Sequence, residues 1–338
     1  MQIAKNGIGI SRPNPSVGAV IVCENKIIGE GFTSNYGQNH AEVNAVNSVK
    51  NKALLKEATI YVTLEPCSHF GKTPPCADLL VKHQFKNVVI GCVDVNYLVA
   101  GKGIERLRNA GINVITGILE DKCRAHHKRF FTVQEKKRPY IILKWAETKD
   151  GFIAPLRKNE QKPVWVSNKI SQQLVHKYRG EEHAILVGTN TVIADNPKLN
   201  VRSWYGNNPI RIVLDKSLRI PKTSNVFDGS VKTIVITEAK DNRNDQQCKA
   251  LFFEAIDFNE KIAEQICAVL HKHQIQSVII EGGTKTLQTF IDANLWDEAR
   301  VFTGETSFVK GIKSPIFLAK TTSETKIKND ILKIYNND

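Results

Sequence analysis

The first 137 residues alternate between short apolar runs and longer segments of mixed polarity. The turn residues 24–26 separate the first two apolar runs, which indicates a hairpin. Between the later runs the pattern predicts helices from residue 41, from Pro75 as the first helical position, and over 103–110. Because strands and helices alternate, we predict a mixed sheet with helices on both faces. The apolar runs typical of buried strands are 18–23, 27–31, 58–64, 87–92 and 113–116.

A second alternating set begins after residue 138. Before this set, the pattern over residues 118–137 predicts one helix that runs into a charged linker. Helices are then predicted after Ser167, which is a suitable N-cap, over 259–271, and from Gly282-Gly283-Thr284 through Phe290. A chain of 338 residues is long for one core, so we predict two domains, 1–137 and 138–338. The strand runs of the second domain are 139–144, 183–188, 210–214, 232–237 and 277–281.

The composition is ordinary for a soluble globular protein, with 41% hydrophobic and 24% charged residues. The seven cysteines are odd in number and scattered, which argues against a disulfide framework and for a reducing compartment. The sequence has no apolar run of membrane-spanning length and no signal-peptide layout at its start. We therefore expect a cytoplasmic protein.

The net charge of +13 is compatible with nucleic acid, a membrane surface or a phosphorylated small molecule as partner. Residues 1–137 contribute a balance of +7 and the remainder +6, without a basic tail or a block of five like charges. This even spread favours a phosphorylated small molecule over nucleic acid. The sequence leaves a homo-oligomer open.

Three side chains have the types and spacing of a zinc site. His40-Ala41-Glu42 is followed by Pro66-Cys67 and then by Cys76. One His and two Cys leave an open position on a tetrahedral zinc ion, and zinc lowers the pKa of a bound water to about 7. Glu42, beside the first ligand, is suited to move protons to and from that water. Cys76 lies at a predicted helix N-terminus, where the helix dipole favours the thiolate form.

The pattern is close to the zinc-dependent nucleobase deaminase signature, H-x-E followed by P-C-x-x-C. Here eight residues, and not two, separate the cysteines. A structural zinc site with His69 as fourth ligand, or no metal at all, are the alternatives, and the first leaves Glu42 without a role.

The turn Gly282-Gly283-Thr284 joins a predicted strand to a helix. Such a turn can hold a phosphate with backbone N–H groups at the helix N-terminus. The same glycines would also be needed for the geometry of a tight turn alone.

Several motifs together resemble the bifunctional riboflavin-biosynthesis deaminase/reductase family, and the resemblance covers nearly the whole chain. The eight-residue cysteine spacing within residues 63–76 is the form typical of that family. The other matching motifs are 13–20 (PNPSVGAV), 40–43 (HAEV), 150–151 (DG), 188–192 (GTNTV), 194–197 (ADNP), 211–215 (RIVLD) and 281–283 (EGG).

The resemblance implies an α/β protein with an N-terminal three-layer cytidine-deaminase-like domain and a C-terminal dihydrofolate-reductase-like domain. It implies zinc-dependent removal of the 2-amino group of a diaminopyrimidinone ribosylamine 5′-phosphate. An NADPH-dependent reduction of the ribosyl group to a ribityl group would follow and give 5-amino-6-(5-phosphoribitylamino)uracil.

The resemblance also implies roles for individual residues. His40, Cys67 and Cys76 would hold zinc, and Glu42 would pass a proton to the leaving ammonia. The candidates to hold the pyrimidine and phosphate are Asn14, His69 and Lys72. The positions that would contact NADPH are Ala146, Trp165, Thr191, Asp195, Gly282, Gly283 and Thr284. The positions that would contact the substrate of the reductase are Arg179, Leu199, Arg202 and Glu281.

Three features depart from the pattern of that family. The chain starts where the middle of the first helix of the family is expected. The loop Asp94-Val95-Asn96-Tyr97 lacks two prolines, which predicts a less rigid loop. Pro163 stands where the family often has Ser, which removes one hydroxyl contact.

Two alternative functions remain open at this point. In one, only the deaminase half is active and the other half is a scaffold. In the other, the chain is a nucleic-acid-binding or RNA-editing deaminase, which a basic stripe with interleaved aromatic residues would favour.

Overall fold

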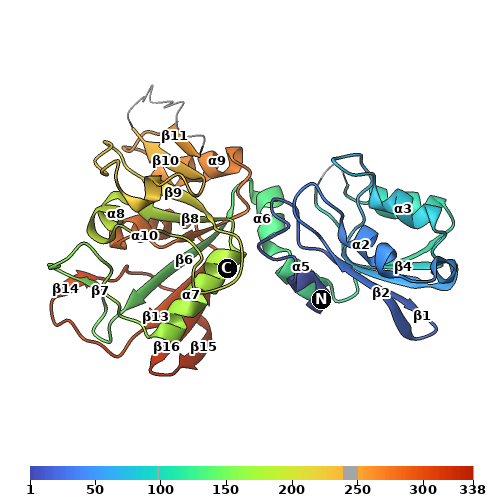
Figure 1. Cartoon of the computed structure of the whole chain (residues 1–338), viewed down its shortest axis with the longest axis horizontal. Helices are drawn as coiled ribbons and strands as arrows, with labels where there is room; N and C mark the ends of the chain where they lie inside the picture. Colours follow the sequence, from blue (N-terminus) through green and yellow to red (C-terminus); the bar gives the residue numbers. More distant parts are fainter. Residues whose placement is uncertain (97–98, 239–249, 338) are drawn as a thin grey trace. The chain divides into compact units, whose positions relative to one another are not determined.

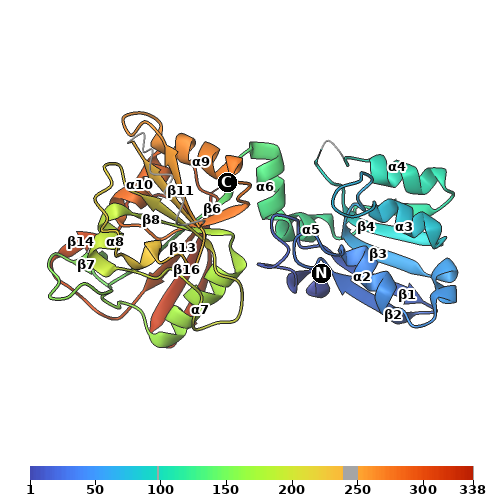
Figure 2. The ribbon, with the colours of Figure 1, turned by 45° about the horizontal axis from the view of Figure 1, so that its top comes forward.

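The computed structural model describes residues 1–96, 99–238 and 250–337. The chain divides into two compact units, Met1–Lys137 and Arg138–Asp338. In Figure 1 and Figure 2 each unit is a twisted sheet with helices packed on it.

The first unit contains a five-stranded mixed sheet with the strand order β2-β1-β3-β4-β5. The predicted hairpin is confirmed, because β1 pairs antiparallel with β2. β1 also pairs antiparallel with β3, whereas β3, β4 and β5 are parallel to one another. The bounds are β1 Gly18–Cys23, β2 Lys26–Phe32, β3 Thr59–Leu64, β4 Asn87–Cys92 and β5 Asn113–Thr116.

Helices cover both faces of this sheet, as the alternation predicts. A side chain at Gly31 would lie 2.3 Å from the backbone nitrogen of Ala45 in α2, so α2 packs directly on the sheet. A side chain at Gly91 would lie 2.3 Å from Cys123 Sγ in α5, on the opposite face. Helices α3 and α4 lie on the α2 side, and α1 lies on the α5 side. The bounds are α1 Gln2–Lys5, α2 Ala41–Ser48, η1 Lys52–Glu57, α3 Cys76–Lys82, α4 Lys102–Asn109 and α5 Glu120–His126.

Two local predictions in this unit are wrong. The single helix predicted over 118–137 is two helices, α5 and α6 (Lys128–Lys136), with His127 at the break. Pro75 is the N-cap of α3 and not its first helical residue, because its ψ of 134° is outside the helical range.

The second unit contains a nine-stranded sheet with the order β11-β10-β9-β8-β12-β6-β13-β16-β15. The strands from β11 to β13 are parallel, and β16 and β15 add an antiparallel edge. A separate two-stranded sheet pairs β7 (Phe152–Pro155) with β14 (Gly311–Lys313). The bounds of the large sheet are β6 Tyr140–Glu147, β8 Ala184–Gly188, β9 Ile210–Leu214, β10 Thr233–Thr237, β11 Leu251–Ala255, β12 Ser277–Ile280, β13 Glu298–Thr303, β15 Thr321–Ile327 and β16 Asp330–Asn336.

The core of this unit lies on both faces of the sheet. Along β8, Leu186 belongs to the cluster that includes α9 and α10, whereas Ile185 and Val187 pack with Val192 of α8 on the other face. Central parallel strands are buried on both sides, which explains their continuous apolar runs. The helices are α7 Lys169–Glu181, α8 Thr189–Asp195, η2 Asn225–Phe227, α9 Ile262–Lys272 and α10 Thr284–Asp292.

The N-cap predicted for α7 is also wrong. The N-cap is Asn168 and not Ser167, because Asn168 Oδ1 accepts hydrogen bonds from the N–H groups of Ile170 and Ser171. Asn168 Nδ2 also donates to the Ile327 carbonyl at the end of β15, 2.7 Å away.

Among the described residues, no helix is both long and apolar enough to cross a membrane. The six cysteines in the described ranges are free thiols, and Cys248 lies outside those ranges.

Candidate active sites

Three elements of the first unit bring His40, Cys67 and Cys76 together. His40 is the N-cap of α2, Cys76 is the first residue of α3, and Cys67 follows the end of β3. His40 Nδ1 lies 3.6 Å from Cys67 Sγ and 3.4 Å from Cys76 Sγ. All three candidate ligand atoms lie within 4.8 Å of one another. The folded chain therefore gathers the three predicted ligands at one point.

The donor set of this group fits a zinc ion with one open coordination position. The Cys76 N–H donates to Cys67 Sγ over 3.3 Å. Hydrogen bonds from Cys76 and His40 lower the pKa of Cys67 to about 4, although burial opposes them. A thiolate is the form of cysteine that binds metal. Since His69 does not belong to the group, the alternative with a fourth protein ligand loses its candidate.

Glu42 lies in the first turn of α2, two residues beyond His40, and only 3% of its surface is exposed. Burial is the main reason why its pKa rises to about 7. A carboxyl group with such a pKa can both accept and release a proton near neutral pH.

Glu65 has a structural role that the sequence analysis missed. Its buried carboxylate accepts hydrogen bonds from the backbone N–H groups of Asp94, Gly101, Gly103 and Ile104, at 3.0 to 3.3 Å. These groups belong to the loop after β4 and to the start of α4. Glu65 therefore holds that loop and helix against the segment that carries Cys67. The feature of the sequence that could have indicated this role is a charged residue placed between an apolar strand and Pro66-Cys67.

The three predicted pyrimidine and phosphate contacts lie in loops of the first unit. Asn14 forms a turn before β1, with its N–H donating to the Ser11 carbonyl over 2.9 Å. Lys72 Nζ lies 3.9 Å from the centre of the Tyr36 ring. His69 Nδ1 is buried and has no hydrogen-bond partner among the described residues.

His69 also lines a cavity of about 540 Å³ beside the cysteine segment, together with Ser68, Lys102, Glu105, Arg106 and Asn109. In the loop predicted to be less rigid, burial raises the pKa of Asp94 to about 6, and its Oδ1 accepts from the Asn96 N–H. Tyr97 of that loop lies outside the described residues.

A cleft of about 620 Å³ opens in the second unit between the ends of β6 and β12, α8 and the segment 153–167. Thr284 is not among the lining residues, and its hydroxyl donates to the Lys313 carbonyl. Six of the seven predicted NADPH positions line the cleft: Ala146, Trp165, Thr191, Asp195, Gly282 and Gly283.

Two walls of the cleft are joined at the glycine turn. The Gly283 N–H donates to Thr191 Oγ1 over 3.1 Å, and Gly283 is the N-cap of α10. From the segment 153–167, Lys158 forms an ion pair with Asp195 at the end of α8.

The predicted substrate positions of this unit differ in their exposure and in whether they line the cleft. Glu281 lines the cleft, directly after β12. Leu199 is buried in the apolar cluster beneath α8, with 2% of its surface exposed. Arg202 is exposed, and its Nη1 lies 3.2 Å from Asn200 Oδ1.

Glu281 is the centre of a buried charge cluster. Arg179 Nη2 lies 2.7 Å from Glu281 Oε2, and Lys144 Nζ lies 3.8 Å from Glu281 Oε1. Burial alone would raise the pKa of Glu281, but the two cations outweigh it and lower the pKa to about 2.

Burial lowers the pKa of Lys144. Lys144 also lines the cleft, and the sequence analysis missed it; a charged residue inside an apolar strand run was the signal.

Two family models match separate parts of the chain. The family model described as the cytidine and deoxycytidylate deaminase zinc-binding region matches residues 1–92, and that of the RibD C-terminal domain matches 139–308. The riboflavin biosynthesis protein RibD of Aquifex aeolicus is 41% identical over 304 residues, which cover 89% of this chain and 84% of that protein. The chain belongs to the RibD family. RibD of Escherichia coli K12 is 33% identical over 316 residues, covering 89% and 84% of the two chains.

Solved RibD structures have the same fold over nearly the whole length. The Thermotoga maritima diaminohydroxyphosphoribosylaminopyrimidine deaminase/5-amino-6-(5-phosphoribosylamino)uracil reductase aligns with a TM-score of 0.87 at 36% identity, covering 99% of this chain and 95% of its own. Acinetobacter baumannii RibD gives 0.88 at 33% identity, covering 99% and 96%. The predicted fold class is confirmed: a cytidine-deaminase-like domain precedes a dihydrofolate-reductase-like domain.

As a RibD protein, the chain is a bifunctional enzyme that carries out the deaminase and then the reductase step of riboflavin biosynthesis. The family acts on pyrimidine intermediates.

Proposed function

We propose that Met1–Lys137 is a zinc-dependent deaminase acting on 2,5-diamino-6-(5-phosphoribosylamino)pyrimidin-4(3H)-one. Arg138–Asp338 then reduces the deaminated ribosyl compound with NADPH to 5-amino-6-(5-phosphoribitylamino)uracil. The observation that carries the deaminase assignment is the gathering of His40, Cys67 and Cys76 beside the buried Glu42.

In the first unit, His40, Cys67 and Cys76 would hold the zinc ion. When bound, zinc supplies activation of water for attack on the ring carbon that carries the 2-amino group. Glu42 would move the two protons of that water in turn, one to the adjacent ring nitrogen and one to the departing amine, which leaves as ammonia while the ring carbon gains a carbonyl oxygen. A pKa of about 7 suits both transfers.

Substrate binding in this unit falls to Asn14, His69 and Lys72. The free Nδ1 of His69 supports a role in hydrogen bonding to a ligand, because a buried polar atom without a partner is costly. Lys72, fixed over the Tyr36 ring, offers a cation for the phosphate.

In the second unit, the cleft would hold NADPH against Ala146, Trp165, Thr191, Asp195 and the Gly282-Gly283-Thr284 turn. The cofactor supplies a hydride, and the protein supplies position. The cleft walls described above support this assignment for six of the seven positions.

The substrate of the reductase would lie against Glu281, with Arg179, Leu199 and Arg202 around it. Arg179 is held by Glu281, so it orients that carboxylate, whereas the exposed guanidinium of Arg202 suits a phosphate. Hydride transfer to the ribosyl carbon also needs a proton, and Lys144, which lines the cleft with its Nζ 3.8 Å from Glu281 Oε1, would donate it.

We also propose a cytoplasmic location, supported by the scattered free cysteines and by the metabolic substrate.

The deaminase assignment is tested by the metal content of the purified chain and by ammonia release from the diaminopyrimidinone before and after chelation. We expect about one zinc per chain, set by one three-ligand site, loss of ammonia release with the chelator, and recovery with added zinc. Ammonia release that survives complete removal of zinc would refute the assignment.

A further inference from the structure

We propose that strand β9 fixes the position of helix α8, which forms one wall of the reductase cleft. It does so at both ends of the helix: through Thr189 at the start of α8 and through an Asn196–Asn225 pair at its end. The consequence for NADPH binding rests on the proposed function of the cleft. The positioning of α8 by β9 does not depend on that function.

Helix α8 forms one wall of the cleft with five of its seven residues. It is a short helix, and short helices are not stable by themselves. Its position must therefore come from its attachments. The residues that face the cleft are Asn190, Thr191, Ile193, Ala194 and Asp195.

The start of α8 is attached to the end of β9. Thr189 Oγ1 lies 2.7 Å from the Leu214 carbonyl oxygen and 3.2 Å from Asp215 Oδ1. Asp215 is 1% exposed and is fixed in turn by the backbone N–H groups of Arg219 and Ile220. The first residue of the helix thus meets a rigid turn.

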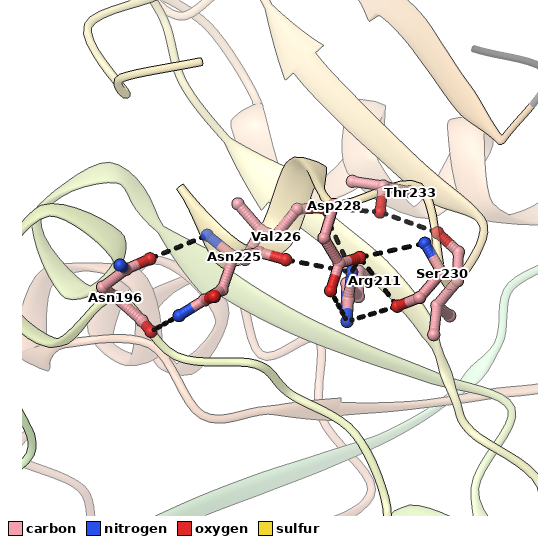
Figure 3. Close-up of polar contacts among 8 residues, drawn as sticks. Asn196, Arg211, Asn225, Val226, Asp228, Ser230 and Thr233 are labelled. Atoms are coloured by element: carbon pink, nitrogen blue, oxygen red, sulfur yellow. Dashed lines mark hydrogen bonds and ion pairs between the residues drawn. The ribbon is translucent and has the colours of Figure 1, made fainter. Parts of the chain in front are cut away.

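The end of α8 is attached by two hydrogen bonds, both donated by Asn225, which Figure 3 shows. Asn196 follows the helix in the left-handed region, with φ of 42°, and its N–H donates to the Val192 carbonyl. Asn196 Oδ1 accepts from the Asn225 N–H over 2.8 Å, and the Asn196 carbonyl accepts from Asn225 Nδ2 over 2.7 Å.

Asn225 is held in its turn by Arg211, the second residue of β9. Arg211 is fully buried, and its Nη1 lies 3.2 Å from the Asn225 carbonyl, 3.4 Å from the Val226 carbonyl and 2.7 Å from Asp228 Oδ1 (Figure 3). Charge-assisted bonds of this kind are the stronger ones in proteins. A continuous set of contacts therefore runs from β9 through η2 to the residue after Asp195.

These contacts explain motif residues that have no place in the chemistry. Asn196 belongs to the ADNP motif, and Arg211 and Asp215 are the two ends of the RIVLD motif. None of the three lines the cleft. Their common effect is to set where Thr191 and Asp195 stand, so they are positioning residues.

The test uses Asn196→Gly in the full chain. Glycine accepts a positive φ without strain, so this change removes the Oδ1 acceptor but keeps the backbone conformation. Asn294→Gly is a matched control, because Asn294 follows α10 with φ of 52° and accepts from Asn337 Nδ2, away from the cleft-lining residues. Asn196→Asp keeps the acceptor and should retain wild-type NADPH affinity.

Two readouts are measured. The Kd for NADPH of Asn196→Gly should rise about three- to tenfold, which is the effect of one lost hydrogen bond. Hydrogen exchange of the α8 amides should accelerate in the protein without NADPH, by a similar factor of about three to ten. Neither change is expected in Asn294→Gly.

Unchanged exchange of α8 in a folded Asn196→Gly protein would overturn the inference. If that variant does not fold, Asn225→Leu, which has the same shape but no Nδ2 donor, gives the same test. If α8 exchange accelerates but the wild-type chain binds no NADPH, the positioning by β9 stands and the proposed NADPH site fails.

Discussion

In the proposed mechanism Glu42 is the acid–base group of the first unit, and it lies outside the group of three candidate zinc ligands. Its burial beside three zinc-ligand candidates gives it a pKa near neutrality. Glu42→Gln keeps the shape of the side chain but cannot transfer a proton. We expect kcat for ammonia release to fall about 10²- to 10⁴-fold, the usual contribution of a general acid–base.

The control for Glu42→Gln is the zinc content, which should stay at the wild-type level because the three ligands remain. A variant that keeps its zinc and releases ammonia at the wild-type rate would show that another group moves the proton.

His127 should make the first unit sensitive to acid. It is buried at the break between α5 and α6, and its Nε2 lies 3.1 Å from Thr63 Oγ1. The Gly18 N–H donates to the same Thr63 oxygen. Burial is the main reason why the pKa of His127 falls from 6.5 to about 3, and His126 and the N-terminal ammonium lower it further.

Because the pKa is lower in the folded chain, the unfolded chain binds the extra proton between pH 6.5 and 3. Stability from this group is complete above pH 6.5 and is lost as the pH falls toward 3. One pKa unit corresponds to about 1.4 kcal/mol, so the loss amounts to a few kcal/mol. In His127→Gln, urea unfolding at pH 7 and pH 5 should show a smaller difference than in the wild type.

Two neighbouring groups remain in that variant. His126, whose pKa burial also lowers, titrates in the same direction, and Asp94, with a pKa raised to about 6, titrates in the opposite one. An undiminished pH dependence in His127→Gln would assign the effect to such groups.

At the scale of the elements, Glu65 should stabilise the start of α4. Its carboxylate accepts hydrogen bonds from four backbone N–H groups in a loop and at a helix start. Glu65→Gln replaces one acceptor oxygen with a donor, which cannot pair with N–H groups. We expect the unfolding free energy to fall by about 2–3 kcal/mol, the cost of unsatisfied buried groups.

Glu57→Gln is the matched control for Glu65→Gln. Glu57 is exposed and its ion pair with Lys86 spans 3.7 Å, so its loss should change stability little. Equal stabilities of the two variants in urea unfolding would contradict the role given to Glu65.

The sequence predicted elements where one residue pattern was enough. The runs that became β1, β4, β8 and β12 are apolar because these strands are buried. β15 has only polar or half-exposed positions, so it carries no such pattern and was missed. α8 was missed because a single residue of it, Val192, is fully buried. The choice of Asn168 over Ser167 as N-cap depends on a contact with Ile327, far away in the sequence.

Some residues of the candidate sites could also be predicted from a sequence pattern, and others could not. The grouping of His40, Cys67 and Cys76 could be predicted because the types and spacing of these residues are those of a zinc site. For Glu65 and Lys144, a charged residue beside or within an apolar run marks the position but not its role. That role comes from what folding places around each side chain: four N–H groups in one case, and Glu281 in the other. Arg179 was expected to contact the substrate of the reductase, and in the structure its guanidinium group pairs with Glu281.

At the scale of the whole molecule, the two chemistries should be separable. Cys67→Ser removes a candidate zinc ligand and should abolish ammonia release, while NADPH oxidation with the deaminated substrate continues at the wild-type rate. Lys144→Gln should do the reverse, because Lys144 belongs to the second unit only. Each variant is assayed with both substrates. Loss of NADPH oxidation in Cys67→Ser would show that the second unit depends on the zinc site.

The central claim is that one chain performs both steps in order. It is tested most directly by supplying wild-type protein with the diaminopyrimidinone ribosylamine phosphate and NADPH, and following ammonia release and NADPH oxidation in the same reaction. We predict that ammonia appears first and that NADPH is consumed in equal amount after a lag. Ammonia release without NADPH consumption would contradict the claim and leave the cleft of the second unit without its proposed reaction.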